Sequence, residues 1–513
     1  MTATDWTAGY VADIGYTYGY YLELSTLRAE LALAFNAVAC PEFNTACELG
    51  FGQGISANFH AAASPVEWYG TDFNPAQAGF AQELGAASGA NINLYDDSFA
   101  EFANRSDLPE FDFIGLHGIW SWISDENRQV IVDFIDRKLK VGGVLYISYN
   151  TFPGWAAFAP MRNLMTQHAE VIGSEGRGIV SKIDGAIEFA ENLLKTNPLF
   201  LRANPQIGEK IKNIKDQNRH YLAHEYFNKD WHPMHFSKIA EMLKLAKMDF
   251  VCSAHLVDSI HKAHFTNEQH EFLKSIPDTI LRESVRDFMV NQQFRRDYWV
   301  KGRRNLSMLE RHETLHSKRF LLQQAREDIK ATVALAQGEA NLTEEVYKPI
   351  LDLMADQKPL SIGEISESVA SNNISFEQVT EAMMVLATDG RAMPVQGEAA
   401  IEASLANTQK LNEAITEKSR SNANIMQLAS PVSACGVSVN RLEQLFLKSR
   451  KLGKQDPKEW AQDVWSILAA QGERLVKDGK PLETPEENLA AITDQAVHFA
   501  EKRLAVLESF KVA

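Results

Sequence analysis

Short apolar runs alternate with amphipathic segments through the first 150 residues of the chain. Runs of this kind, separated by helices, are typical of strands in a parallel sheet that is covered on both faces. The pattern therefore predicts an α/β fold with a doubly wound, mostly parallel sheet. The expected strands are the run that ends at Glu48 and residues 66–72, 92–95, 111–116 and 144–147, with a helix at about 125–139.

A glycine-rich loop follows the first run. In the segment E-L-G-F-G-Q-G, Gly50, Gly52 and Gly54 let the backbone turn sharply and approach a ligand. A dinucleotide fingerprint would need its third glycine at the position of Ile55, so the spacing does not fit NAD. Glu48 would repel a pyrophosphate but attract an ammonium or a sulfonium cation, and S-adenosylmethionine carries both. The loop favours S-adenosylmethionine, with a simple turn as the alternative.

Two more carboxylates follow the next two predicted strands. Asp72 lies 24 residues beyond Glu48, close to the ~20-residue offset at which an acidic side chain binds a ribose diol. Asp97, after the third strand, could accept a hydrogen bond from an adenine amino group. Each acid alone could be a solvated loop residue. Because cofactors bind at strand carboxyl ends in this architecture, the three together predict a nucleotide-cofactor site.

Several motifs resemble those of the class I S-adenosylmethionine-dependent methyltransferases: E-L-G-F-G-Q-G, T-D-F-N-P, D-D-S-F and G-G-V-L-Y-I-S-Y-N. H-G-I-W-S-W, S-Y-N-T-F-P-G-W and Y-L-A-H-E-Y resemble the bacterial branch with a methyltransferase regulatory domain, which includes the rickettsial-type protein lysine methyltransferases. The resemblance covers residues 16–302 and is more specific for the cofactor than for the acceptor. The cofactor-binding residues that it implies are Glu48, Gly50, Gly52, Gly54, Asp72, Phe73, Asp97, Ser98, His117 and Gly118.

The acceptor is less well defined. The resemblance implies a protein lysine; the alternatives are a saccharide or small-molecule acceptor, or a regulatory scaffold that binds the cofactor without turnover. A lysine must first lose a proton, which burial beside aromatic rings favours, whereas an oxygen acceptor would need a firmer general base. The expected catalytic residues are His117, Tyr149 and His224. The expected acceptor contacts are Trp120, Tyr149, Asn150, Trp155, Tyr221 and His224.

Two regions allow two interpretations each. Tyr16, Tyr18, Tyr20 and Tyr21 precede an amphipathic helix at 25–35; they could line an acceptor pocket or pack as ordinary half-buried aromatics. Arg295 and Arg296 lie in a segment, 283–302, that is interpreted as a helix. There a solvated face is favoured over a binding patch.

Helical patterns dominate the remaining sequence. Residues 156–217 predict a helical cap, and 236–256 a helix and strand that would complete the sheet. Three short helices at 342–354, 362–369 and 376–389 resemble a winged helix, but the start of the third has no lysine or arginine, which favours protein contacts. Asp456-Pro457 and Thr484-Pro485 begin two further helices. The expected units are a cofactor-binding domain at 1–160, a middle domain at 161–330 and a helical C-terminal domain at 331–513.

The composition of the chain indicates which kinds of binding partner to expect. The 513 residues, 45% of them hydrophobic, contain no apolar run near the ~18 residues needed to span a bilayer and no signal-peptide pattern, so we expect a cytoplasmic protein without a membrane partner. A net charge of −16 disfavours nucleic-acid binding. The cysteine and histidine spacings match no metal motif, so no metal is expected. An acceptor protein or small molecule is the expected partner, and a homodimer is left open.

Overall fold

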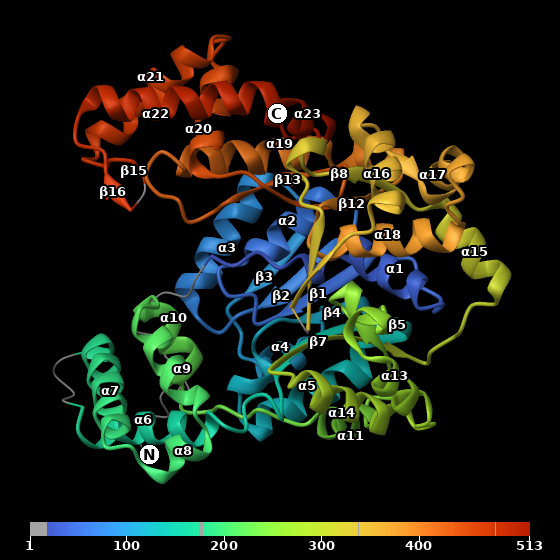
Figure 1. Cartoon of the computed structure of the whole chain (residues 1–513), viewed down its shortest axis with the longest axis vertical. Coiled ribbons are helices and arrows are strands. Elements are labelled where there is room, and N and C mark those ends of the chain that lie inside the picture. Colours follow the sequence, from blue (N-terminus) through green and yellow to red (C-terminus); the bar gives the residue numbers. More distant parts are fainter. Residues whose placement is uncertain (1–17, 174–177, 337, 478) are drawn as a thin grey trace.

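The computed structural model describes residues 18–173, 178–336, 338–477 and 479–513. Its centre is a seven-stranded sheet of order β3-β2-β1-β4-β5-β7-β6 (Figure 1). The first five strands are parallel and lie at their predicted places, β5 being longer than expected, which confirms the doubly wound fold. They are β1 Thr45–Leu49, β2 Glu67–Thr71, β3 Ile92–Tyr95, β4 Phe111–Leu116 and β5 Leu139–Asn150.

The last two strands come from the predicted middle region. β6, Met248–Ser253, was expected and pairs antiparallel with β7, Phe294–Lys301, which also pairs antiparallel with β5. The helix predicted over 283–302 is wrong in its second half, because α14 ends at Val290 and the chain then turns back as β7. The solvated face expected for Arg295 is also wrong, since this residue is 3% exposed.

Helices cover both faces of the sheet. Successive side chains of a strand point to opposite faces; accordingly, Tyr146 of β5 packs into the core beside α1, and Leu145 and Ile147 pack into the core beside α5 and α11. One face carries α1 Thr26–Phe35, α2 Ile55–Ala63 and α3 Pro75–Ser88; the other carries α4 Phe99–Ala103, α5 Asp125–Lys138, α11 Phe236–Lys244 and α14 Thr279–Val290 (Figure 1).

Five helices after β5 form a lobe beside the sheet, at the lower left of Figure 1. The lobe has its own core, in which Trp155 and Phe158 pack with Ile183 and Ile211. Pro198 and Pro205 each stand at a helix start, as their effect on helix continuation requires. The helices are α6 Ala159–Val171, α7 Gly178–Lys195, α8 Leu199–Ala203, α9 Gln206–Lys215 and α10 Arg219–Tyr226.

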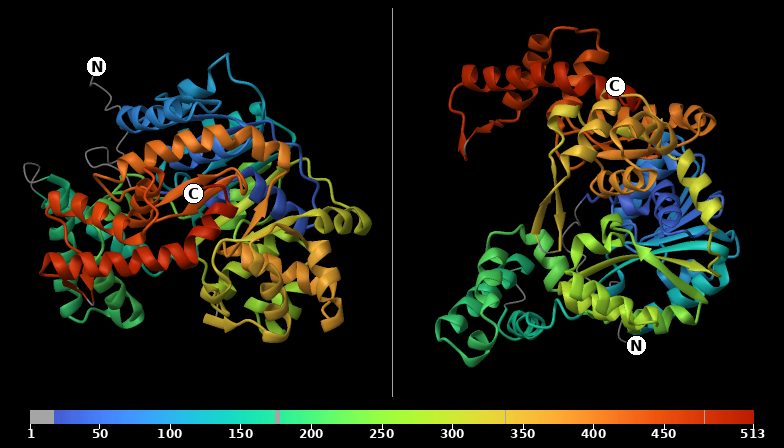
Figure 2. Two further views of the ribbon diagram at one scale, coloured as in Figure 1. Left: turned by 90° about the horizontal axis from the view of Figure 1, so that it is seen from above. Right: turned by 45° about the vertical axis from the view of Figure 1, so that its right-hand side comes forward.

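The C-terminal region covers the layer of α1–α3 (Figure 2), with α19 packed across α2 and α3. The three predicted short helices form, but the small sheet beside them has as its central strand β8, which precedes them, and β12 is followed by α19. The winged helix is therefore not confirmed. The elements are β8 Arg319–Leu322, α16 Glu344–Leu353, β11 Leu360–Ser361, α17 Ile362–Val369, α18 Phe376–Thr388, β12 Ala392–Val395, α19 Glu398–Lys418, α20 Arg441–Lys451, α21 Pro457–Ala470, α22 Pro485–His498 and α23 Leu504–Ser509.

Shorter elements connect these layers. They are α12 His261–His264, α13 Asn267–Lys274, α15 Met308–Ser317, and the two-stranded pairs β9 Thr332–Leu335 with β10 Gly338–Asn341, β13 Gln427–Ser430 with β14 Cys435–Ser438, and β15 Val476–Lys477 with β16 Lys480–Pro481. Among the described residues, no helix has both the length and the apolar character that crossing a membrane requires.

Candidate functional site

A cavity of about 170 Å³ lies at the carboxyl ends of β1–β4, and we call it the donor cavity. Parallel strands bring their ends to one edge of the sheet, so residues far apart in the chain meet there. All the cofactor-binding residues expected from the sequence line this cavity except Gly54. Those that line it are Glu48, Gly50, Gly52, Asp72, Phe73, Asp97, Ser98, His117 and Gly118.

The glycine loop has the backbone that its composition predicts. Gly50, Gly52 and Gly54 have φ values of 71°, 57° and 66°, in the left-handed region that side chains rarely adopt. A Cβ on Gly50 would lie 2.7 Å from Cγ2 of Ile119. Gly54 lies outside the cavity, where a Cβ would come within 2.4 Å of the Cβ of Ala81 in α3. Gly54 therefore allows α2 and α3 to pack closely against each other.

Glu48, at the end of β1, is a buried carboxylate that lacks a full set of partners. It is 2% exposed, and its Oε2 atom has no hydrogen-bond partner among the described residues. Burial, and next the charge of Asp72, raise the pKa of Glu48 well above its usual range. An unsatisfied buried carboxylate is costly, and a cation placed in the donor cavity would remove that cost.

Asp72, just beyond β2, helps to hold the glycine loop in place. Its Oδ2 accepts a hydrogen bond from the backbone N–H of Gly52 at 2.8 Å, and its Oδ1 accepts one from that of Asn74 at 3.1 Å. Asn74 is the N-cap of α3 and Pro75 follows at its first turn. Burial raises the pKa of Asp72 to about 6 despite these two hydrogen bonds. Asp72 therefore joins the ends of two strands at one wall of the cavity.

The carboxylate of Asp97 already has a partner within the chain. Its Oδ2 lies 3.1 Å from Nη1 of Arg105, and this guanidinium stands 3.9 Å over the ring of Tyr95. The hydroxyl of Ser98 is the N-cap of α4 and forms a capping box with Glu101. Ser98 thus has a structural role that the sequence interpretation did not assign to it.

His117 lies between two tyrosines at the end of β4. Its ring stacks on that of Tyr21 with centroids 3.5 Å apart, and its Nδ1 lies 2.7 Å from the hydroxyl of Tyr146. Burial lowers the pKa of His117 to about 4, so the imidazole is neutral at pH 7. The N–H of Gly118 donates to Oγ of Ser148 at 2.8 Å. A neutral ring nitrogen at this place can accept a proton or a hydrogen bond.

The N-terminal tyrosines divide between the two interpretations. Tyr16 lies outside the described residues. Tyr21 lines the donor cavity, whereas Tyr20 does not, and its hydroxyl oxygen accepts a hydrogen bond from the N–H of Gly436 at 2.7 Å. Tyr18 packs edge-on against Phe80.

The residues expected to contact the acceptor do not line the donor cavity. Trp120 and Tyr149 are fully buried in the core beside α5, because Tyr149 points to the opposite face of β5 from Tyr146. The Tyr149 hydroxyl donates to Asp297 Oδ2 at 2.7 Å. Asn150 is 3% exposed at the end of β5. Trp155, Tyr221 and His224 belong to the lobe of α6–α10.

Several lining residues were missed by the sequence interpretation. Gln77 and Phe99 lie in the first turns of α3 and α4, directly after Asp72 and Asp97, so proximity in the chain could have indicated them. Asp230 could not have been found in this way. It belongs to the loop after α10, which is tied to the site by a hydrogen bond of 2.7 Å from the His232 N–H to the Ser121 carbonyl.

Residues 218–301 match the family model of a "predicted methyltransferase regulatory domain". The chain is 38% identical to protein sll1526 of Synechocystis sp. over 99% of its own length and all of that protein, and 21% identical to protein RP789 of Rickettsia prowazekii over 86% and 82% of the two chains.

A solved structure, that of PKMT2 from Rickettsia typhi in complex with AdoHcy, is similar in fold. The TM-score is 0.69 at 15% identity, over 96% of this chain and 98% of that one. At 15% sequence identity, this similarity shows that the two proteins share a fold. The chain belongs to the family of the Synechocystis protein sll1526, and it combines the fold of the S-adenosylmethionine-dependent methyltransferases with a methyltransferase regulatory domain.

Proposed function

We propose that this protein transfers a methyl group from S-adenosylmethionine to lysine side chains of a protein acceptor. One observation carries the cofactor half of the proposal: Glu48 presents an unpartnered carboxylate oxygen in the donor cavity, beside the left-handed Gly50 and Gly52 and beside Asp72. A buried carboxylate of this kind suits a ligand that brings its own positive charge.

The residues of the donor cavity fit S-adenosylmethionine along its length. Glu48 and the loop at Gly50 and Gly52 would hold the methionyl part, Asp72 the ribose diol, and Asp97 the adenine amino group. The bound cofactor supplies a methyl carbon that is already activated by a sulfonium. The AdoHcy named for the Rickettsia typhi structure, with its matching fold, supports this assignment.

The chain must align the acceptor nitrogen, exclude water and allow a proton to leave. Tyr21 and the neutral His117 form an aromatic wall that carries no positive charge, so a lysine beside it would not be repelled. Removing a lysine from water lowers its pKa from ~10.4 toward neutrality. The motifs shared with rickettsial-type protein lysine methyltransferases support a lysine acceptor.

The test is a transfer assay with methyl-labelled S-adenosylmethionine and fractionated bacterial lysate. Methyl-lysine in acid hydrolysates of the labelled polypeptide is the expected result. Label in glycan or in small molecules would replace the lysine proposal with a different acceptor. Cofactor binding with no label in any fraction would indicate a scaffold. The Asp72→Ala variant, assayed in parallel, controls for label that enters without the donor cavity.

A further inference from the structure

A cavity of about 490 Å³ lies where the lobe of α6–α10 meets the start of α5, and we call it the lobe cavity. The first turns of α6 form one wall and contribute Arg162 and Asn163. The first turn of α5 contributes Asp125 and Arg128, and the loop at 231–234 forms a third wall. The lobe cavity therefore lies between the lobe and the domain that carries the donor cavity.

One positive charge in the lobe cavity is not compensated within the chain. The lining residues with a fixed charge at pH 7 are Asp125, Arg128 and Arg162. Arg128 is paired with Asp125 at 2.8 Å, and it also donates to two backbone carbonyl groups. No carboxylate of the described residues lies within 4.0 Å of the guanidinium nitrogens of Arg162. The lobe cavity therefore favours an anion.

Arg162 is buried, and its hydrogen bonds are incomplete. It is 7% exposed, its Nη2 donates to the carbonyl of Asn228, and its guanidinium carbon lies 5.1 Å from the centre of the Trp231 ring. Its Nε is buried with no hydrogen-bond partner among the described residues. Burial lowers the pKa of Arg162 to about 10, so the group is still charged at pH 7. A carboxylate bound there would compensate this buried charge.

The lobe cavity and the donor cavity lie on opposite sides of the same two segments, 122–128 and 230–232. Asn127 and Asp230 line the donor cavity, whereas Arg128 and His232 line the lobe cavity. The side chains of Asp230 and His232 are 29% and 44% exposed and lie 3.1 Å apart across this boundary. Solvent-exposed surface therefore connects the two cavities.

The two cavities have opposite charge. The described residues that line the donor cavity include no lysine or arginine, and their carboxylates are those of Glu48, Asp72, Asp97 and Asp230. The first three have places in the proposed cofactor site, and Asp230 does not. A ligand with a positive group beside Asp230 and a negative group beside Arg162 would match both charges.

We propose that the lobe cavity is a specificity site for the acceptor polypeptide, in which Arg162 binds the carboxylate of an aspartate or glutamate close in sequence to the target lysine. Asp230 attracts that lysine toward the donor cavity. This inference rests on the proposed function and adds the class of acceptor sequence. Four residues of extended chain span about 13 Å, more than the ~10 Å width of a helix, so an acid within four positions of the lysine can reach past α5.

The test compares acidic and neutral acceptor peptides. The probes are dye-labelled peptides with a central lysine in a glycine–serine background and one glutamate at a defined position within four residues of it. Each has a counterpart with glutamine in place of glutamate. Fluorescence anisotropy, on protein loaded with S-adenosylhomocysteine, measures affinity. At one or more positions, glutamate should increase affinity about tenfold over glutamine. Equal affinity at every position would overturn the inference.

Two substitutions of arginine locate the effect. Arg162→Gln removes the uncompensated charge and should abolish the preference for glutamate. Arg202→Gln is the matched control, because Arg202 is an exposed residue of α8 in the same lobe that does not line the lobe cavity. It should keep the preference.

A second variant leaves Arg162 in place. Asn163 is an exposed residue of α6 that lines the lobe cavity, so Asn163→Glu supplies a carboxylate from the chain itself and should also abolish the preference. Gln167→Glu, one turn further along α6 and outside the cavity, is its control and should have no effect. A preference that persists in both Arg162→Gln and Asn163→Glu would overturn the inference.

Two further measurements separate the kinds of failure. N-acetylglutamate methylamide carries the carboxylate without a lysine; if it binds as tightly as the peptides, the site takes a free carboxylate and the acceptor assignment is wrong. The transfer assay with methyl-labelled S-adenosylmethionine tests the proposed function on the same preparations. Label in polypeptide without any preference for glutamate would reject the specificity site alone, and absence of label from polypeptide would reject the proposed function as well.

Discussion

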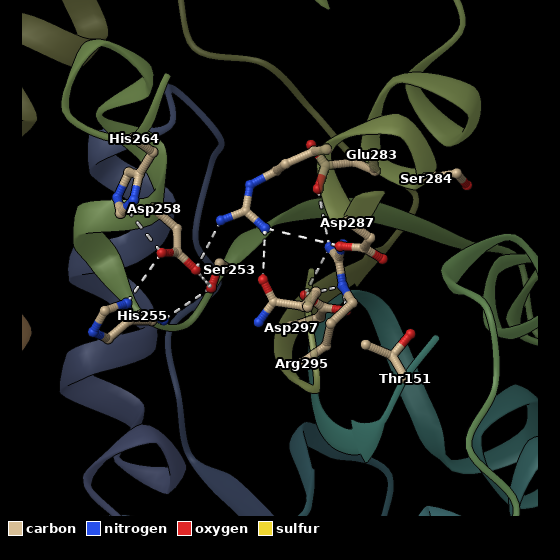
Figure 3. Close-up of polar contacts among 12 residues, drawn as sticks. Thr151, Ser253, His255, Asp258, His264, Glu283, Ser284, Asp287, Arg295 and Asp297 are labelled. Atoms are coloured by element: carbon tan, nitrogen blue, oxygen red, sulfur yellow. Dashed lines mark hydrogen bonds and ion pairs between the residues drawn. The ribbon is translucent and has the colours of Figure 1, made fainter. Parts of the chain in front are cut away.

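The donor cavity and the ion-pair network around Arg295 of β7 differ in how their buried charges are compensated. In the donor cavity, Glu48 keeps one oxygen without a partner. In that network, Arg295 lies between the carboxylates of Glu283, Asp287 and Asp297, and Arg286 is paired with Asp258 (Figure 3). A buried charge without a partner can be compensated by a bound ligand. A network of buried ion pairs instead fixes the positions of the helices and strands that carry it. The first arrangement should respond to substitution through ligand affinity, and the second mainly through stability.

The position of this network also shows how the segment that matches the regulatory-domain model is built into the fold. Residues 218–301, which match that family model, contain β6 and β7. These strands complete the sheet whose other end carries the donor cavity. The matched segment is therefore part of the methyltransferase sheet and cannot be removed without exposing β5.

Substitution of Arg295 should have the largest effect on stability. Arg295→Met leaves the buried carboxylates of Asp287 and Asp297 without their counter-charge, at a cost of about 3–5 kcal/mol. Arg304→Met is the control, because Arg304 forms an exposed ion pair with Glu310 that solvent screens. Chemical denaturation measures both. Similar midpoints for the two variants would show that the network does not stabilise the sheet.

Substitution of Asp72 should reduce cofactor affinity while the fold persists. Asp72→Ala removes the acceptor for the Gly52 N–H and the proposed ribose contact, and hydrogen bonds to charged groups contribute about 1.5–3 kcal/mol each, so we expect at least a tenfold loss. Asp107→Ala, at an exposed carboxylate outside the cavity, is the control. Calorimetry with S-adenosylhomocysteine gives the affinities and circular dichroism the fold. Unchanged affinity in Asp72→Ala would remove Asp72 from the site.

Cofactor affinity should depend on pH in the acidic range. Burial raises the pKa of Asp72 to about 6 in the free protein, and a ribose diol donates to the ionised form, so protonation competes with binding. Affinity should be full above about pH 7 and fall roughly tenfold by pH 5 for this one group. Glu48, whose pKa is also raised, would steepen the fall. The Asp72→Asn variant should show a shallower profile; a flat wild-type profile would contradict the assignment.

The smallest effect is expected at Asp97, whose carboxylate is paired with an arginine, as the carboxylates around Arg295 are. Arg105→Gln removes an ion pair that is partly exposed and worth about 0–1 kcal/mol. We expect cofactor affinity to change by less than about fivefold. A loss as large as that of Asp72→Ala would mean that Arg105 itself contacts the cofactor.

Most of the sheet could be predicted because its first five strands are apolar runs with clear helix starts between them. β7 could not, because Arg295, Arg296 and Asp297 give it a polar sequence. Arg295 and Asp297 are buried there by pairing with each other and with α14. Such pairing is a tertiary property, so it leaves no periodic signal in the sequence.

The donor half of the site was predictable for a similar reason. Glu48 lies at the end of β1, Asp72 and Asp97 lie just beyond β2 and β3, and parallel strands end together. The acceptor half depends on details that the sequence does not carry. Tyr149 and Tyr146 are three residues apart, yet they are buried on opposite faces of the sheet, and only Tyr146 lies beside His117. Asp230 reaches the cavity only through the fold of a distant loop.

The central claim is that Glu48 binds the positively charged end of the cofactor. The most direct test compares wild type and Glu48→Gln for S-adenosylhomocysteine and for adenosine, which lacks the amino-acid part. Removing one partner of a buried charge pair costs about 2–5 kcal/mol, so Glu48→Gln should weaken S-adenosylhomocysteine at least thirtyfold and leave adenosine within about twofold. Glu67→Gln, at a half-buried carboxylate outside the cavity, should change neither. Equal effects of Glu48→Gln on both ligands, or none on either, would contradict the account.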